Sequence, residues 1–404
     1  MASVTNHDIF ETLCEIEVVD LRAVALRNIT SRTNPGRPEP TGPRATHHRP
    51  LKTPGQDDIS IVQYHPDLGA ITGPQPTFSL LLSTWESSGN CFFHEACVYL
   101  PAHDELYITS NLLQSASSAQ HPVVIISRLQ LSRNPAPGGA VESVSWQKLR
   151  PPPNMPMPAG GAMYRYGILF CSQGTTAPGT GGLFYMPRGQ RPEPVVTNFF
   201  GRDFNSVHSV AVARDGSLWF TDPCHGFEKE FRQRPQLPSQ IYRYDPATGD
   251  LRVMADGLDR PHGIALSPDE STVYVTDTDA VCADGTQDPG RAATIYAFDV
   301  MKRFSSPFLA NKRVFAYALT GIPKGLVCDN RGNVYAGCAD GVEIWNAGGT
   351  ILGVIEVPGG VTSMSFGRGG ELFLCAEQRL WRVRIGVEDW AFSGPLSPSA
   401  RDFH

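Results

Sequence analysis

The sequence predicts an all-β protein, a six-bladed β-propeller with four-stranded antiparallel blades and an N-terminal extension. A strand–turn–strand pattern recurs six times at spacings of about 40 to 65 residues, which leaves room for two further strands in each copy. The 404 residues include 39 Gly and 34 Pro, and only 18% of them are charged. This composition is typical of many short strands joined by tight turns.

Three copies of the repeat are the clearest, at 208–222, 262–277 and 324–338. Each has a short apolar strand, a turn rich in Asp, Gly, Asn or Pro, and a second apolar strand, which together predict a β-hairpin. A β-sandwich would not reuse one hairpin six times, and a solenoid would repeat with a tighter and more constant period. The three weaker copies are EACVYLPAHDELYITS from Glu95, GGAMYRYGILFCS from Gly160 and TSMSFGRGGELFLCA from Thr362.

The ends of the chain differ from the repeats. Residues 34–57 are too rich in Pro and polar groups to pack, and ETLCEIEVVDLRAVALRNIT before them fits either a helix or a strand. We expect PTFSLLLSTW (76–85) and RLWRVRI (379–385) to pair, because a propeller closes its ring by joining both chain ends in one blade. The predicted division is an N-terminal extension and Pro-rich linker or wrapping arm over 1–57, the propeller over 58–390, and a loose C-terminal tail over 391–404.

The net charge, the hydropathy pattern and the cysteine content indicate which partners and which location to expect. The net charge of -6 gives no basic stripe, which excludes a nucleic-acid partner. No apolar run reaches the ~20 residues of a membrane span, and the N-terminus lacks the features of a signal peptide. The nine Cys include no CxxC pair, so we expect reduced thiols and a cytoplasmic location. The expected partner is a small-molecule substrate, bound by a monomer or weak dimer.

The starting residues of the six innermost strands should meet at one face of the central channel. A lone His at a strand start is usually structural. Four ionisable groups at the same offset instead favour a functional site, because their proximity would shift their pKa values. We therefore predict that Glu95, His208, His262 and Lys324 are catalytic. The full ring is Glu95, Gly160, His208, His262, Lys324 and Thr362.

Neighbouring residues complete the predicted site. Asp222 and Asp277 lie at the far ends of second strands, where a turn-capping or blade-to-blade role is at least as good an interpretation as catalysis. Aromatic residues in the adjoining loops could line an apolar pocket over the channel. The residues predicted to bind substrate are Phe93, Gln173, Asn205, His225, Phe227, Thr278 and Thr362.

The chain resembles the gluconolactonase and senescence-marker-protein family, especially its fungal lactonohydrolase branch, over roughly residues 78 to 386. The resemblance is carried by FFHEACVYLP, AGGAMYRYGILFCSQG, NFFGRDFNSVHSVAVARDGSLWFTDPCHG, LPSQIYRYDPATG, RPHGIALSPDESTVYVTDT and IPKGLVCDNRGNVYAG. It implies a lactonase fold and a divalent metal, typically calcium, in the central channel.

The metal ligands implied by the resemblance are mostly replaced. Glu95 matches the family glutamate, but His208-Ser209 stands in place of an Asn-Asp pair and Lys324 in place of a later aspartate. His262 replaces the Asn of a Pro-Asn-Gly turn. A hard cation prefers several oxygen ligands. Lys324 would also place a positive charge near the ion: two like unit charges at ~4 Å repel by about 4 kcal/mol at a dielectric of ~20, and a dication doubles that repulsion. We therefore expect no cofactor; if Ca, Zn or Mn is retained, its ligands would be Glu95, His208 and His262.

The predicted function is that of an intracellular, metal-independent natural-product enzyme. It would catalyse a non-hydrolytic cyclisation or cycloaddition of the hetero-Diels–Alder type on a small polar-aromatic or terpenoid-derived substrate. The fold also resembles the hetero-Diels–Alderases of fungal tropolone sesquiterpenoid pathways. Histidines would serve as acid/base groups and Lys324 would stabilise a developing oxyanion. Two alternatives stay open, a divalent-metal-dependent lactonase and a non-catalytic ligand-binding propeller.

Overall fold

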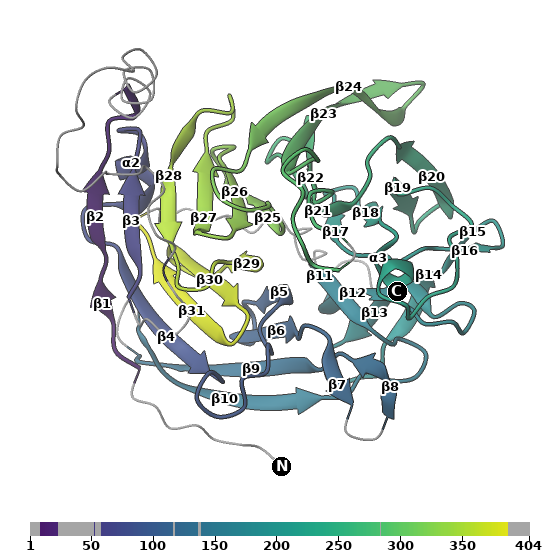
Figure 1. Cartoon of the computed structure of the whole chain (residues 1–404), viewed down its shortest axis with the longest axis horizontal. Helices are drawn as coiled ribbons and strands as arrows, with labels where there is room; N and C mark the ends of the chain where they lie inside the picture. The colour runs from purple at the N-terminus through teal and green to yellow at the C-terminus, as the bar shows by residue number, and fades with distance from the viewer. Residues whose placement is uncertain are drawn as a thin grey trace, which may run out of the picture.

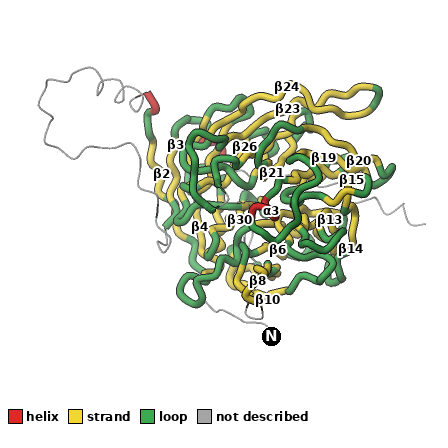
Figure 2. Tube along the Cα trace, turned by 45° about the vertical axis from the view of Figure 1, so that its right-hand side comes forward, coloured by secondary structure: helices red, strands yellow, loops and turns green. Residues whose placement is uncertain are grey.

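The computed structural model arranges antiparallel sheets around a central axis, as the view down that axis shows (Figure 1). Strands and loops make up nearly all of the trace (Figure 2). The predicted all-β, six-bladed propeller is therefore confirmed. The structure describes residues 9–22, 52, 58–115, 118–135, 139–282 and 284–386.

The first three blades are four-stranded sheets, numbered here by the chain order of their innermost strands. Blade 1 contains β5 (Glu95–Leu100), β6 (Glu105–Thr109), β9 (Ile126–Arg133) and β10 (Val141–Leu149). Blade 2 contains β11 (Pro158–Tyr164), β12 (Gly167–Gln173), β13 (Gly181–Pro187) and β14 (Glu193–Val196). Blade 3 contains β17 (Val210–Val212), β18 (Leu218–Asp222), β19 (Gln240–Asp245) and β20 (Asp250–Ala255).

The last three blades follow the same plan, with N-terminal strands added to two of them. Blade 4 contains β21 (Pro261–Leu266), β22 (Thr272–Asp277), β23 (Thr294–Arg303) and β24 (Ser306–Tyr317). Blade 5 contains β25 (Leu326–Cys328), β26 (Val334–Cys338), β27 (Gly341–Trp345), β28 (Ile351–Glu356), β3 (Ser60–Gln63) and β2 (Glu15–Val18). Blade 6 contains β29 (Ser363–Phe366), β30 (Glu371–Ala376), β31 (Arg379–Arg384), β4 (Thr77–Ser83) and β1 (Thr12–Leu13).

The ring closes where β31 pairs antiparallel with β4, with Val383 opposite Phe78. This confirms the predicted pairing of 76–85 with 379–385. The segment that fitted either a helix or a strand contributes short strands, β1 on the edge of β4 and β2 parallel to β3. These two strands lie along the outer edges of blades 5 and 6 (Figure 1). The Pro-rich linker and the C-terminal tail lie outside the described residues, apart from Lys52, so the predicted domain limits stay predictions.

Short elements fill connections both within blades and between them. Helix α2 (Leu68–Thr72) precedes β4, and helix α3 (His225–Glu228) follows the second strand of blade 3. Two small hairpins complete the set, β7 (Leu113–Ser115) with β8 (Ser118–Val123), and β15 (Asn198–Phe199) with β16 (Arg202–Asp203).

Burial explains why second strands read as continuous apolar runs. All residues of β6, β12, β18 and β30 are buried, because each lies in a sheet that packs against neighbouring blades on both faces. All nine cysteines are free, and four of them are buried among apolar side chains. In the described part of the chain, no helix has the length and apolar character needed to cross a membrane.

The innermost strands approach one another closely at their starting ends. A Cβ added to Gly263 would lie 2.3 Å from the carbonyl oxygen of Lys324, and one added to Gly325 would lie 2.8 Å from that of Thr362. Glycine is therefore required at these contacts between adjacent blades. The side chains at the strand starts are drawn together around the channel as a result.

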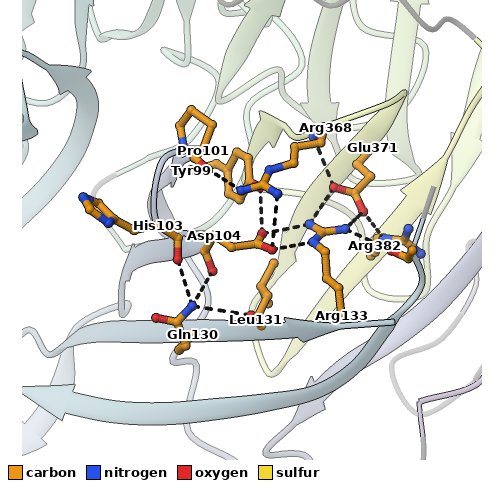
Figure 3. A network of polar contacts seen from close by, with 11 residues as sticks. Tyr99, Pro101, His103, Asp104, Gln130, Leu131, Arg133, Arg368, Glu371 and Arg382 are labelled. Carbon is orange, nitrogen blue, oxygen red and sulfur yellow. Dashed lines mark hydrogen bonds and ion pairs between the residues drawn. The ribbon is translucent and has the colours of Figure 1, made fainter. Parts of the chain in front are cut away.

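A network of ion pairs joins blade 6 to blade 1 (Figure 3). Arg133 donates to Asp104 at 2.6 Å and to Glu371 at 2.5 Å. Glu371 also accepts from Arg382 at 2.5 Å, and Arg382 pairs with Glu11 of the N-terminal segment. We call Asp104, Arg133, Glu371 and Arg382 the seam network, because it bridges the last blade and the first.

Candidate functional site

Three histidines from two blades and one helix meet at the channel. His208 and His262 lie at the starts of the innermost strands of blades 3 and 4, and His225 is the first residue of α3. Ring centroids are 3.9 Å apart for His208 and His262, and 5.1 Å apart for His208 and His225. All three side chains are buried.

Thr221 fixes the backbone of two of these histidines. Its hydroxyl donates to the carbonyl oxygen of His262 at 2.7 Å, and its own carbonyl accepts the amide N–H of His208 at 2.9 Å. Since Thr221 belongs to the buried strand β18, the rigid core of blade 3 sets the spacing of the two imidazoles. The two histidines that the register argument placed together therefore lie together in the folded chain.

Glu95 completes the group from blade 1. Its Oε1 lies 3.5 Å from Nε2 of His262 and 4.0 Å from Nε2 of His94. Burial raises the pKa of Glu95 to about 7, against the opposing charges of His94 and Lys324. That oxygen is buried and has no hydrogen-bond partner among the described residues. We call Glu95, His208, His225 and His262 the channel cluster.

The imidazoles of the channel cluster are held neutral. Burial lowers the pKa of His208 and of His262 well below the usual value, and it lowers the pKa of His225 to about 4. The positive charge of Lys324 adds to the effect on His208 and His262. Nδ1 of His208, Nδ1 of His262 and Nε2 of His225 lack hydrogen-bond partners within the described chain, and Nδ1 of His225 lies 3.6 Å from Oε2 of Glu228. Unpartnered buried polar atoms are uncommon and call for an explanation.

Two residues at the site escaped the sequence analysis. His94 Nδ1 lies 2.8 Å from Oε1 of Glu377, which sits in the turn between β30 and β31. Burial alone would raise the pKa of Glu377, but His94 and Lys324 hold it down at about 2. His94 precedes Glu95 in the sequence and could have been found as its neighbour. Glu377 carries no local signal, because only the ring closure brings it near.

Several residues predicted to bind substrate have structural partners instead. The Thr362 hydroxyl donates to the carbonyl oxygens of His94 at 2.5 Å and Cys375 at 3.1 Å, so it ties blade 6 to blade 1. The Asn205 side chain donates to the carbonyl oxygen of Leu237 at 3.1 Å. The Thr278 hydroxyl lies 3.2 Å from the carbonyl oxygen of Arg260. These contacts give structural roles to both hydroxyls and to the Asn205 Nδ2 group, whereas Oδ1 of Asn205 is buried with no hydrogen-bond partner among the described residues.

The remaining predicted residues lie in different surroundings. Phe93 is fully buried against Trp146, which places it in the core rather than in the channel. Gln173 is buried at the end of β12, whereas Phe227 in α3 is 46% exposed. Asp222 accepts the backbone N–H groups of residues 205 and 206, and Asp277 accepts those of 259 and 260. Both aspartates therefore cap turns.

These features define a propeller with a buried acid–base cluster at the mouth of its channel. The chain belongs to the SMP-30/Gluconolactonase/LRE-like family, whose model matches residues 155–376. It is 28% identical to the lactonohydrolase oryL of Aspergillus oryzae over 79% of this chain and 72% of that protein. It is 31% identical to a gluconolactonase of Zymomonas mobilis over 47% of this chain and 53% of that one.

A solved structure gives the same result for the fold. The gluconolactonase XC5397 of Xanthomonas campestris matches with a TM-score of 0.62 and 25% identity, covering 84% of this chain and 99% of that one. The expected membership of the gluconolactonase-like family, with fungal lactonohydrolase relatives, is confirmed.

The donor atoms of the channel cluster decide which metal they suit. Glu95 is the one carboxylate among its four members, and calcium prefers several oxygen ligands. The set therefore does not fit calcium. One ligand atom from each of His208, His225 and His262 lies within 4.8 Å of the others. Imidazole nitrogens with no other partner fit a borderline ion such as zinc.

Proposed function

We propose that the chain is a metal-independent natural-product enzyme that catalyses a non-hydrolytic cyclisation or cycloaddition, of the hetero-Diels–Alder type, in the central channel. The observation that carries the proposal is the position of Glu95. This buried carboxyl, with a pKa of about 7, lies beside a neutral imidazole and within the field of Lys324. The group is poised to exchange protons near neutral pH.

A polar-aromatic substrate shows what these groups can do. With a 2-(hydroxymethyl)phenol, ionised Glu95 accepts the phenolic proton, and the ammonium group of Lys324 stabilises the phenolate oxygen. Protonated Glu95 returns the proton to the benzylic hydroxyl, whose C–O bond breaks and releases water. The ortho-quinone methide then adds to an alkene held beside it, forming one C–C and one C–O bond. Proximity in the channel lowers the barrier of that second step.

The proposal includes the setting of the enzyme. Nine free cysteines are typical of a reducing compartment, which supports a cytoplasmic location. The partner would be a small-molecule substrate alone, without nucleic acid or membrane, bound by a monomer or weak dimer.

A model reaction tests the proposal. Chelator-dialysed protein is incubated with 2-(hydroxymethyl)phenol and ethyl vinyl ether, and the chroman product is separated by chiral chromatography. We expect an enantiomeric excess that disappears in Lys324→Ala and His262→Ala and persists in Ala247→Phe, a control in an exposed turn. A racemic product at the uncatalysed rate, or stoichiometric metal that survives dialysis and is needed for turnover, would contradict it.

Lactone hydrolysis is the second candidate, favoured by relatives named as a lactonohydrolase and a gluconolactonase and by unpartnered nitrogens on three imidazoles. His208, His225 and His262 would hold a borderline ion, which would supply Lewis acidity toward a lactone carbonyl. Glu95 would serve as the proton acceptor for the attacking water. Hydrolysis of δ-gluconolactone that requires added zinc and fails in His225→Leu would support this candidate over cyclisation.

A further inference from the structure

The central channel contains a cavity of about 1200 Å³ behind the channel cluster. Glu95 and His262 line one end of it. Arg214, Asp269 and Asn330, from the hairpin turns of blades 3, 4 and 5, line the other end. The volume is slightly above the range of about 300–1,000 Å³ that is usual for small-molecule pockets. It therefore has room for much more than the reacting atoms.

The wall between these ends follows the propeller repeat. At the third residue after each ring position, the innermost strands contribute an apolar residue to the cavity lining in five blades and Ser365 in blade 6. Residues at equal offsets in symmetry-related strands form a belt around the channel. The five apolar members of this belt are Val98, Met163, Ala211, Ala265 and Val327.

We propose that this belt is a subsite for the hydrocarbon part of an amphipathic substrate, whose oxygen-bearing head lies at Glu95 and His262. Burial of apolar surface against the belt favours an alkyl or alkenyl body. A compact polyhydroxylated lactone would instead leave its hydroxyl groups against apolar side chains with no partners. The role of Glu95 in chemistry rests on the proposed function, whereas binding of the hydrocarbon body does not.

Binding of simple alcohols tests the subsite without any turnover. Calorimetry with 1-hexanol, 1-octanol and 1-decanol should give about fourfold tighter binding per added methylene, because each buried methylene contributes about 0.8 kcal/mol. Ala211→Phe should weaken this binding by narrowing the belt, and Ser365→Leu should strengthen it by making the sixth position apolar. Ala247→Phe is the matched control and should bind as the wild type does.

Thermal unfolding of each variant shows whether it is folded. If Ala211→Phe does not fold, Ser365→Leu takes its place as the belt variant. Affinities that do not depend on chain length, or that are unchanged in a folded belt variant, would overturn the inference. Alcohol binding with no cyclisation would remove the proposed function and leave the subsite. Cyclisation of a substrate with a long alkenyl chain at an unchanged KM in folded Ala211→Phe would remove the subsite and leave the function.

Discussion

The seam network and the channel cluster are two groups of ionisable residues that are removed from solvent wholly or in large part, but their polar atoms are partnered differently. At the seam, Glu371 and Arg382 are buried, Asp104 and Arg133 are half-buried, and each member pairs with an opposite charge. In the channel, Glu95 and the three histidines are buried and keep unpartnered polar atoms. Burial alone therefore does not mark a functional site in this molecule. Single unpartnered buried atoms also occur elsewhere, such as Trp146 Nε1 and Trp381 Nε1, so the distinguishing feature of the channel is that several of them gather in one place.

The physical cost of the two arrangements differs. Folding compensates buried charges at the seam with short ion pairs, so removing one partner exposes the full desolvation penalty of the others. Unpartnered groups in the channel already carry part of that penalty, and a ligand that bonds to them would recover it. The channel cluster is therefore organised for binding rather than for stability.

The largest expected effect is on catalysis. Glu95→Gln removes the titrating carboxyl and should lower kcat by about 10²- to 10⁴-fold, the usual contribution of a positioned acid or base. Its free energy of unfolding should stay the same or rise, because a buried acid is replaced by a neutral amide. Glu142→Gln, at an exposed acid on β10, should leave both quantities unchanged. If Glu95→Gln lost stability without losing kcat, Glu95 would have the structural role that we assign to the seam network.

The seam should respond in the opposite way. Arg133→Met leaves Asp104 and Glu371 without this partner and should cost about 3–5 kcal/mol in the free energy of unfolding, measured with urea. The kcat of the folded fraction should not change. Arg313→Met breaks a half-exposed pair with Asp299 and should cost less than about 1 kcal/mol. Equal effects of the two substitutions would mean that the seam network contributes no more than a surface pair.

A histidine of the cluster sharpens the contrast. His225→Leu removes an unpartnered Nε2 and an Nδ1 whose contact with Glu228 is long, at 3.6 Å, and should leave stability unchanged or raise it by about 1 kcal/mol. Urea unfolding of the metal-free variant measures the change. A loss of several kcal/mol would reveal a partner for His225 in the folded protein.

Acid unfolding provides a smaller test. The pKa of His225 is lowered from 6.5 to about 4, so the unfolded chain binds this proton first. The stability that depends on neutral His225 should be full above pH 6.5 and decline as the pH falls toward about 4. His225→Leu should have a shallower decline over this window in urea unfolding at several pH values. Parallel curves would show that His225 is not buried as a neutral group.

The repeat explains which parts of the site the sequence can predict. Strand starts at equal offsets converge, so Glu95, His208 and His262 could be placed together from register alone. His225 was expected near them only as a neighbour in the loop. Glu377 could not be found, because a turn of blade 6 reaches the site through ring closure.

The same limit applies to the seam and to the substrate-binding predictions. Arg133 and Glu371 are 238 positions apart, and neither lies at a repeated offset that would indicate a partner. Thr362 is a ring position and Phe93 lies two residues before Glu95, but Phe93 packs into the core just before β5 begins. The Thr362 hydroxyl donates a hydrogen bond to the carbonyl oxygen of His94 across two blades. Register predicts where a backbone goes more reliably than where a single side chain points.

The pH dependence of kcat for chelator-treated protein tests the central claim most directly. If Glu95 is the base, the rate should rise with pH through about 7, since ionisation of this carboxyl makes it competent, and the rise should vanish in Glu95→Gln. The account predicts this profile without added metal. A flat profile in the wild type, or activity that appears only when metal is restored, would contradict it.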